Sequence, residues 1–409
     1  MDKIKLLLIA PTFYPVHGGA GLRFYRYLPY FYKLGVETTV ICGTPKSKKF
    51  SAEDNNADWL QYQDGVLVDE IVSKNAKILK YKIPGKGSKQ RSRVLLNKAV
   101  DFCANEGTKP DVVHVIAPMP YDVINQLKEV KRFGIKLTYS HTIAKEYSSN
   151  FLIKLLQQWK VKQVLNQYDR VLVQSSALKD IIKATNLRSD VKIIPNGVDT
   201  KQFSPVNSPQ EKTKLRHSLN LPENAIIITL VGAVHPRKGT NLLIDAWTRI
   251  VEKYPNVNLL FIGPRYDLSR NELSRFKETI ELLISKSKMS KNIHFLGQVD
   301  CVDKYLKASD MFVFPSEREG MPNAVLEAMS SNLPIVLTPF IGLSKELGVA
   351  DEHYLLADRN SESLQENILK LISDKSLSDT LALQAREWVI NNMTIEKSAE
   401  RHVEEFQSV

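Results

Sequence analysis

The stretch MFVFPSEREGMPNAVLEAM, residues 311–329, joins three local patterns in a fixed order. Four consecutive apolar residues are typical of a short buried strand, the charged residues and glycine that follow indicate a loop, and NAVLEAM has the apolar spacing of a helix. A strand that passes through a loop into a helix is one unit of a parallel sheet covered by helices. This stretch therefore predicts an α/β fold.

The same alternation extends along the chain in both directions. In the first half, the predicted strands Ile4–Ala10 and Val112–Ile116 alternate with helical patterns such as Leu22–Tyr32. A second series of the same kind begins at Ile226–Val231 and ends in a helical region. Two similar α/β domains therefore follow each other.

Turn-forming residues predict the boundary between these two series. PNGVD, residues 195–199, is followed by the polar stretch Ser204–Lys214, which contains two prolines. We therefore predict an N-terminal domain at residues 1–204 and a second domain at residues 205–390. Residues 391–409 form a helical C-terminal segment.

Length and composition place the chain among ordinary globular proteins. Its 409 residues suffice for two domains, and 43% hydrophobic with 25% charged residues excludes disordered and coiled-coil classes. The three cysteines lie far apart and match no zinc-binding spacing, so we expect reduced thiols and a cytoplasmic protein. No run approaches the roughly 20 apolar residues that cross a bilayer. We therefore expect any contact with a membrane to be peripheral, at its inner face.

Positive charge is concentrated in the N-terminal half. Residues 1–200 contain 31 Lys and Arg against 18 Asp and Glu, whereas residues 201–409 have a net charge of −2. Nine basic residues and no acidic residue lie in the segment Lys74–Lys98, which either attracts phosphate groups or is a solvated loop. Because Tyr81 is the one aromatic residue there, the segment lacks stacking platforms for bases, and we expect no nucleic acid partner.

A predicted helix of the same half is a second candidate for membrane contact. Leu152–Leu165 places Leu155, Leu156 and Trp159 on an apolar side, with lysines among the other positions. Such a helix either packs on the core of its domain or lies on an anionic membrane surface.

Two loops that follow predicted strands contain glycines or cations. HGGAG, residues 17–21, precedes a helix, so its backbone N–H groups either contact an anion or form a tight turn. It is not a dinucleotide fingerprint, because Phe24 stands where GxGxxG requires its third glycine. HPRKG, residues 235–239, places two cations at the carboxyl end of a strand, where they bind a diphosphate or remain solvated.

Two glutamates and two histidines complete the candidates. Glu319 lies in a loop and Glu327 in the following helix, so they cannot share one helical face and suit different parts of one ligand. His141 follows the predicted strand Lys136–Tyr139, at the usual position of site residues in such sheets, although a core or solvated histidine is the alternative. His114 lies inside an apolar run and is expected to be buried at the sheet edge.

These motifs together resemble the glycosyltransferases of the GT-B fold, in particular the retaining enzymes of family 4. The resemblance covers nearly the whole chain and is carried by GGAG at 18–21, SHT at 140–142, IPNGVD at 194–199, RKG at 237–239 and, above all, the two glutamates of EGMPNAVLEAM at 319–329. It implies two Rossmann-like α/β domains that face each other across a cleft, with a C-terminal helix that crosses back to the N-terminal domain.

The resemblance also implies roles for individual residues. Arg237 and Lys238 would bind the diphosphate of a nucleotide-sugar donor, and Glu319 would contact its sugar. Glu327 would hold the ribose, and His141 would hydrogen-bond the sugar near the anomeric carbon. The catalytic set would be His141, Glu319, Lys238 and Arg237. Further donor-binding residues would be Gly18, Gly19, Asn196, Gly232, Gly320, Met321, Pro322 and Asn323.

The implied function is the transfer of a sugar, with retention of configuration and without a metal or cofactor, to a lipid-linked or polysaccharide acceptor. The donor would be a UDP- or GDP-sugar, and the products would be glycolipids, lipopolysaccharides or exopolysaccharides. One departure from the family pattern is Ala233, which stands where an arginine is frequent, so that Arg237 would substitute for it. A non-catalytic nucleotide-sugar-binding partner and a nucleotide-sugar 2-epimerase of the same fold are the alternatives.

Overall fold

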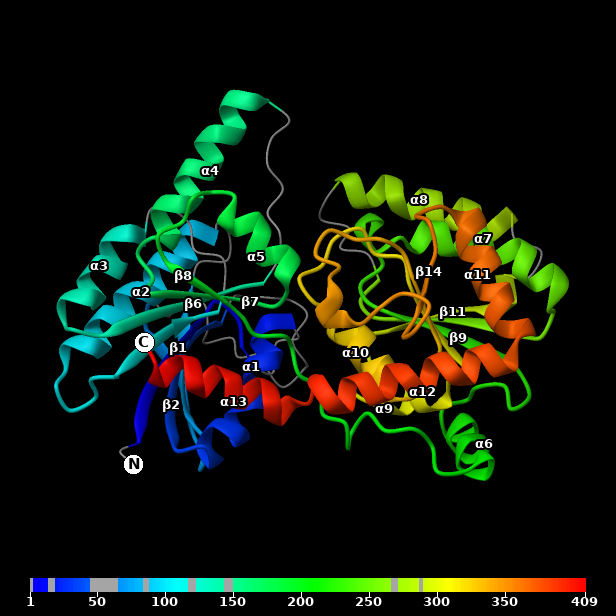
Figure 1. The fold of residues 1–409 in the computed structure, drawn as a ribbon, viewed down its shortest axis with the longest axis horizontal. Helices are drawn as coiled ribbons and strands as arrows, with labels where there is room; N and C mark the ends of the chain where they lie inside the picture. The colour runs from blue at the N-terminus through cyan, green and yellow to red at the C-terminus, as the bar shows by residue number, and fades with distance from the viewer. Residues whose placement is uncertain are drawn as a thin grey trace. The chain divides into compact units, whose positions relative to one another are not determined.

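The computed structural model in Figure 1 describes residues 3–13, 19–44, 65–83, 88–116, 123–142, 150–265, 271–286 and 290–409. The chain divides into two compact units. The first unit combines Met1–Asn196 with the C-terminal residues Ile395–Val409, and the second unit is Gly197–Thr394.

The first unit is built, in its described residues, on an eight-stranded sheet with the order β3-β4-β2-β1-β5-β6-β7-β8. Neighbouring strands are parallel except for β3, which pairs antiparallel with β4 at one edge. The strands are β1 (Ile4–Ala10), β2 (Val36–Thr44), β3 (Leu67–Val72), β4 (Lys77–Lys82), β5 (Val112–Val115), β6 (Lys136–His141), β7 (Arg170–Val173) and β8 (Asp190–Ile193). The helices are α1 (Gly19–Lys33), α2 (Ser88–Ala104), α3 (Ile124–Arg132), α4 (Phe151–Leu165), α5 (Ser176–Lys183) and α13 (Ile395–Gln407).

Both faces of this sheet are buried, which explains the nearly continuous apolar run of β1. Leu6 and Leu8 belong to a core cluster with residues of α1 and α13. Leu7 and Ile9 point to the opposite face and belong to a cluster with residues of α2 and α3. Side chains alternate along a strand, so a strand covered on both sides is apolar at every position rather than at every second one.

The second unit repeats this architecture with a smaller sheet. Its described residues form six parallel strands in the order β11-β10-β9-β12-β13-β14. The strands are β9 (Ile226–Val231), β10 (Val257–Ile262), β11 (Ile293–Gly297), β12 (Met311–Phe314), β13 (Ile335–Leu337) and β14 (Leu355–Leu356). The helices are α6 (Pro209–Ser218), α7 (Thr240–Lys253), α8 (Asn271–Lys286), α9 (Val302–Ala308), α10 (Asn323–Ser330), α11 (Ser361–Ser373) and α12 (Lys375–Asn392).

The boundary between the units lies between Asn196 and Gly197, so the predicted boundary at residues 204 and 205 is wrong by eight residues. Val198 and Phe203 are buried in the hydrophobic core of the second unit. The backbone N–H of Val198 donates to the carbonyl of Met393 over 2.9 Å. Residues 197–204 therefore fold with the second unit although a polar stretch follows them.

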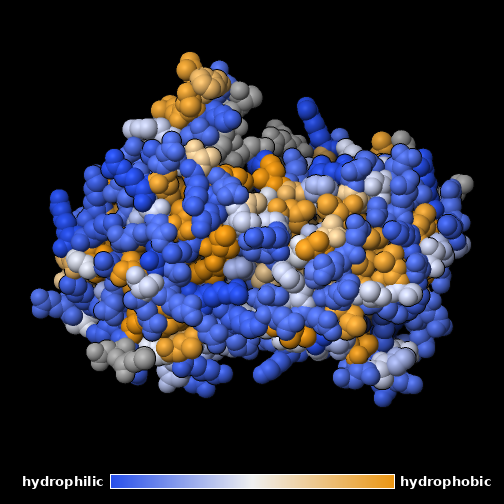
Figure 2. Space-filling model, in the orientation of Figure 1, coloured by the Kyte–Doolittle hydropathy of each residue, from blue (hydrophilic) through white to orange (hydrophobic). Residues whose placement is uncertain are grey.

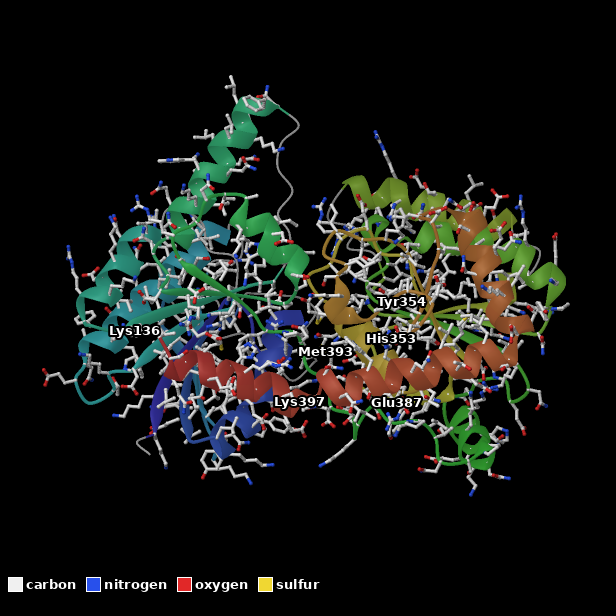
Figure 3. All side chains as sticks on the ribbon, in the orientation of Figure 1. Lys136, His353, Tyr354, Glu387, Met393 and Lys397 are labelled. Atoms are coloured by element: carbon white, nitrogen blue, oxygen red, sulfur yellow. The ribbon has the colours of Figure 1, made fainter. Side chains whose placement is uncertain are left out.

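The chain returns to the first unit after Thr394, four residues later than the predicted start of the C-terminal segment at residue 391. Met393, before this junction, and Lys397, after it, are labelled in Figure 3. α13 then packs against α1, where the hydroxyl groups of Ser398 and Tyr27 lie 2.9 Å apart. The C-terminal helix is thus part of the first unit's core.

His114 is buried, as predicted, but not at the edge of the sheet. It lies on β5, which has β1 on one side and β6 on the other. Its imidazole nitrogens lie 2.7 Å from the Thr138 hydroxyl and 2.9 Å from the Ser140 hydroxyl. Burial lowers the pKa of His114 well below its ordinary value. His114 is therefore a neutral histidine of the sheet interior.

Helix α4 differs from the helices that cover the sheet, because most of its length lies away from the core. Only Val164 and Leu165, at its C-terminal end, are buried. Within the described part of the chain, no helix combines the length and the apolar character that a membrane span requires.

Candidate active site

The candidate residues of the second unit follow two neighbouring strands, β9 and β12. After β9, the chain turns at Gly232 and forms the 3₁₀ helix Pro236–Lys238, which leads into α7. After β12, the loop from Pro315 to Pro322 leads into α10. Because carboxyl ends of parallel strands meet at one edge of a sheet, both loops lie where α/β sheets bind their ligands.

Three side chains from these two loops converge on one oxygen of Glu319. The Lys238 ammonium lies 2.7 Å from Glu319 Oε1, and Arg237 Nη1 lies 3.3 Å from the same atom. The Ser316 hydroxyl donates to Oε1 over 2.7 Å. The side chains of Lys238 and Glu319 are 15% and 13% exposed, which strengthens their attraction relative to a fully solvated pair.

Backbone contacts hold the two loops together beneath this cluster. The Glu317 N–H donates to the carbonyl of Arg237 over 2.8 Å, and the Arg237 guanidinium donates to the carbonyl of Arg318 over 2.7 Å. Gly239 has a left-handed backbone (φ 67°), and a Cβ atom there would lie 2.1 Å from the carbonyl oxygen of Pro315. Glycine is therefore required at this position of RKG for two loops from different strands to meet.

The ammonium of Lys238 also has an aromatic neighbour. It lies 4.9 Å from the centroid of the Phe314 ring, the last residue of β12. A cation near a ring face is attracted to the negative quadrupole of the ring. Lys238 is thus held in a defined position by a carboxylate and an aromatic ring.

Glu327 lies in α10, and its side chain is buried, with the residue 8% exposed. Gly320, Met321 and Pro322 precede this helix and are also buried. Asn323 is the first residue of α10, and N–H groups at the start of a helix have no partner within it. The loop, together with the helix start and Lys238, provides donors suited to a phosphate group.

The remaining candidates belong to the first unit. Gly19 begins α1, His141 ends β6 and is half-buried, and Asn196 is the last residue of the unit. The amide oxygen of Asn196 accepts a hydrogen bond from the Arg23 guanidinium. Gly18 lies outside the described residues. The structure therefore brings Arg237, Lys238 and Glu319 together in one unit, and assigns His141, Gly19 and Asn196 to the other.

Two polar residues that the sequence analysis missed contact candidate residues. Ser316 is fully buried and hydrogen-bonds Glu319. Its signal in the sequence was its place three residues before that glutamate and two residues after the end of a strand. Arg23 is 5% exposed and contacts Asn196. The sequence signal for Arg23 was its spacing: it lies four residues before Tyr27, and residues four apart share one face of a helix.

Comparison with known families assigns the chain to a class. Residues 17–202 match the family described as Glycosyltransferase Family 4, and residues 211–388 match Glycosyl transferases group 1. The chain superposes on sucrose-phosphate synthase from Thermosynechococcus elongatus with a TM-score of 0.77 and 19% identity, covering 99% of both chains. It superposes on HepE from Anabaena, solved with UDP, with a TM-score of 0.74 and 19% identity, covering 99% of this chain and all of that one. The fold is that of a GT-B glycosyltransferase.

Relatives found by sequence comparison are also glycosyltransferases. The chain is 32% identical over 192 residues to an uncharacterised glycosyltransferase of Methanocaldococcus jannaschii, which covers 45% of this chain. It is 26% identical over 264 residues, 64% of its length, to the UDP-Gal:α-D-GlcNAc-diphosphoundecaprenol α-1,3-galactosyltransferase of Escherichia coli. The matched parts span 44% and 66% of these two relatives. The two family models together cover residues 17–202 and 211–388, and the chain belongs to the glycosyltransferase family that they describe.

Proposed function

We propose that the protein transfers a sugar from a nucleotide diphosphate sugar to a lipid-linked or saccharide acceptor. The observation that carries this proposal is the convergence of Lys238, Arg237 and Ser316 on Glu319, at the carboxyl ends of β9 and β12. The cations and helix N–H groups at this edge of the sheet can bind the negatively charged diphosphate of the donor. The carboxylate among them can stabilise the positive charge that develops on the sugar.

The proposed reaction requires stabilisation of charge on the leaving group. When the bond between the anomeric carbon and the diphosphate breaks, its electron pair goes to the phosphate oxygen. Lys238 and Arg237 lie at the site already, and they stabilise that negative charge once donor binding has redistributed their contact with Glu319. Glu319 stabilises the positive charge on the sugar ring. The acceptor hydroxyl oxygen then bonds to the anomeric carbon on the face from which the phosphate departs, so the configuration is retained, and the departing phosphate accepts the hydroxyl proton.

In this proposal the positive charge comes from side chains rather than from a metal ion, and no cofactor takes part. Glu319 is not a nucleophile of the kind found in retaining glycoside hydrolases. Those enzymes need two carboxylates about 5 Å apart around one anomeric carbon. Here Glu319 lies in a loop and Glu327 is buried in a helix eight residues further on, consistent with separate contacts to sugar and ribose.

We infer that the donor is a UDP-sugar, with a GDP-sugar as the second candidate. The solved structures of Anabaena HepE contain UDP or UDP-glucose, and the Escherichia coli relative uses UDP-Gal. A GDP-mannose-dependent relative from Corynebacterium glutamicum keeps GDP as the second candidate. The ribose contact proposed for Glu327 is common to both nucleotides.

We infer a lipid-linked acceptor from the names of relatives that act on diphosphoundecaprenol-linked and diacylglycerol-linked sugars. The protein would then work in the cytoplasm at the inner face of the membrane. The basic segment Lys74–Lys98 supports this less than its composition indicates. Lys77 pairs with Glu70 over 2.8 Å and Lys80 with Asp69 over 2.9 Å, so that acidic residues of the neighbouring strand β3 offset part of its charge.

A panel of nucleotide sugars tests the proposal. Binding of a donor at 100 times its Kd is expected to stabilise the protein by about 2.7 kcal/mol, which a thermal-shift assay detects. Transfer to lipid-linked acceptors is then measured with the best donor, using Lys238→Ala as the test variant and Lys370→Ala, on the exposed side of α11, as its control. No stabilisation by any UDP- or GDP-sugar would contradict the proposal. Epimerised donor without transfer would indicate a 2-epimerase, and donor binding without turnover would indicate a binding partner.

A further inference from the structure

The N-terminal end of α4 exposes a cluster of apolar side chains. We call this cluster the α4 tip, and it comprises Phe151, Leu152, Ile153, Leu155, Leu156 and Trp159. Phe151 and Leu152 are 69% and 74% exposed, values that are unusual for large apolar residues. In Figure 1 α4 rises from the rest of its unit, and in Figure 2 its end is coloured as hydrophobic. Contiguous exposed apolar surface of this kind marks an interaction site.

The tip is a defined helical structure with an anchored base. Asn150 caps α4, because its side-chain oxygen accepts a hydrogen bond from the Ile153 N–H over 3.2 Å. At the other end, Val164 and Leu165 are buried in the core of the first unit. The helix therefore holds its exposed residues at a fixed distance from the sheet.

The charges on α4 select the kind of partner. Residues 150–168 contain Lys154, Lys160 and Lys162 and no acidic residue. The nearest acidic residues in sequence are Glu146, which lies outside the described residues, and Asp169, which pairs with Lys131 over 2.7 Å. An apolar tip with cations around and behind it is complementary to a bilayer that has an apolar interior and anionic headgroups.

The arrangement of apolar and basic side chains on α4 indicates how the helix would be oriented relative to a membrane. At 3.6 residues per turn, the five apolar residues of Phe151–Leu156 spread over roughly 200° of the helix circumference, wider than the stripe of a helix that lies flat. Along the axis, by contrast, the apolar residues come first, and Lys160 and Lys162 lie toward the base. Polarity thus changes along the helix more than around it.

We propose that α4 enters an anionic bilayer with its N-terminal end first. Phe151 and Leu152 reach the acyl chains, Trp159 lies at headgroup level, and Lys160 and Lys162 contact lipid phosphates. From Phe151 to Trp159 a helix rises about 12 Å, and membrane-bound helices bury their apolar residues about 5–10 Å deep, so the length fits when the helix is tilted.

This insertion bears on the proposed reaction and, in that part, rests on the proposed lipid-linked acceptor. α4 follows β6, which ends at His141. Eight peptide units connect Thr142 to Asn150, and that length of chain spans at most about 29 Å. The N-terminal end of α4 therefore lies within about 29 Å of the carboxyl edge of the first sheet, where ligands of such sheets bind. Insertion holds that edge near the headgroups that carry the acceptor.

Vesicle co-sedimentation of the full chain tests the insertion. The vesicles contain phosphatidylcholine with phosphatidylglycerol or phosphatidylcholine alone, at low and high salt. We expect binding to the anionic vesicles, a loss of at least tenfold in Phe151→Ser/Leu152→Ser, and no loss in the control Leu282→Ser/Leu383→Ser, whose side chains are also exposed. Unchanged melting temperatures show that the variants fold.

Trp159 supplies a second readout. Lipids brominated in the acyl chains are expected to quench the fluorescence of the wild type more than that of Trp159→Phe. Equal vesicle binding by the wild type and the tip variant would overturn the proposal. Self-association that is lost in the tip variant while its vesicle binding is unchanged would overturn it too, because the tip would then bind a second copy of the chain. Binding that high salt abolishes and the tip variant retains would also overturn it, because contact would then be electrostatic alone.

The insertion and the proposed reaction can fail separately. Stabilisation by a nucleotide sugar depends on Lys238 and is expected to be unchanged in Phe151→Ser/Leu152→Ser. Conversely, Lys238→Ala is expected to bind vesicles as the wild type does. A tip variant that binds vesicles weakly but still binds the donor supports insertion whatever the identity of the acceptor.

Discussion

Lys238 and Glu319 are 81 residues apart in sequence and form an ion pair with Nζ 2.7 Å from Oε1. The pair joins the loop after β9 to the loop after β12. The cation proposed to bind the diphosphate thus contacts the carboxylate proposed to contact the sugar. Donor binding must redistribute this interaction, which makes each partner's substitution informative.

Lys238→Ala removes the charged donor that is proposed to stabilise the leaving diphosphate. Loss of one such donor costs about 3–4 kcal/mol of transition-state stabilisation, or roughly 10²–10³ in kcat. Steady-state transfer assays with the identified donor measure this loss. Lys370→Ala is expected to retain wild-type rates, and equal rates for the two variants would contradict the role of Lys238.

Glu319→Gln keeps the size of the side chain and removes its charge. We expect kcat to fall about 10²-fold, since the positive charge on the sugar is no longer stabilised. Binding of UDP or GDP is expected to be as tight as in the wild type or tighter, because Lys238 and Arg237 no longer share their charge with a carboxylate. Calorimetric titration with the nucleotide measures this affinity, and a marked weakening would instead make Glu319 a structural support of the diphosphate site.

Ser316→Ala tests whether the Ser316 hydroxyl positions the Glu319 carboxylate. The buried hydroxyl contacts Glu319 and is not itself proposed to contact the substrate. A hydrogen bond to a charged group contributes about 1.5–3 kcal/mol, so we expect kcat to decrease about ten- to a hundredfold with little change in KM. The melting temperature measures the stability cost separately. A rise in KM with unchanged kcat would show that Ser316 supports binding and not the transition state.

The histidines of the first unit predict how stability depends on pH. Burial lowers the pKa of His402 from 6.5 to about 3 and that of His114 well below 6.5. Between these values the unfolded chain binds protons that the folded chain does not, so stability is lost as pH falls below about 6.5. At pH 5.5 His402, whose pKa is about 3, contributes a loss of about 1.4 kcal/mol relative to neutral pH, and the lowered pKa of His114 acts in the same direction.

His402→Gln separates this effect from the titration of carboxylates. The imidazole Nδ1 of His402 lies 2.7 Å from the carbonyl of Ser398, and glutamine retains an N–H donor without a titrating group. Chemical denaturation at pH 7.5 and 5.5 is expected to show a smaller loss of stability in the variant. An identical loss would place the pH dependence elsewhere.

Removal of divalent metal ions is expected to leave activity unchanged. In the proposed reaction, Arg237 and Lys238 supply the positive charge that a metal ion would otherwise bring to the diphosphate. Transfer is measured after dialysis against EDTA and after addition of Mg²⁺ or Mn²⁺. Activity that disappears with EDTA and returns with either ion would show that these side chains are insufficient.

The alternation of strands and helices and the loops with Lys238 and Glu319 were accessible from sequence because their signals are local. Short apolar runs, glycines and helical spacing lie within stretches of about twenty residues, such as residues 311–329. The domain boundary was not accessible in this way. Val198 and Phe203 look like part of a linker, and only their burial in the core of the second unit assigns them to it.

The order of the strands and the surroundings of each helix likewise depend on the tertiary structure and could not be predicted from the sequence. His114 was predicted at a sheet edge, but β5 lies between β1 and β6, because the order of strands depends on how distant segments pair. α4 has the composition of a core helix, yet Phe151 and Leu152 are exposed, since only its last residues reach the sheet. Apolar composition alone does not say whether protein or another partner covers a side chain.

The sequence by itself thus determined the α/β class, the pair of similar domains and the residue types available for a diphosphate and a sugar, because these follow from patterns within single segments. Only the tertiary structure decided that Ser316, Lys238 and Arg237 meet at one oxygen of Glu319. That meeting depends on the adjacency of β9 and β12 and on the close approach of Gly239 to Pro315, which are contacts between segments distant in the chain.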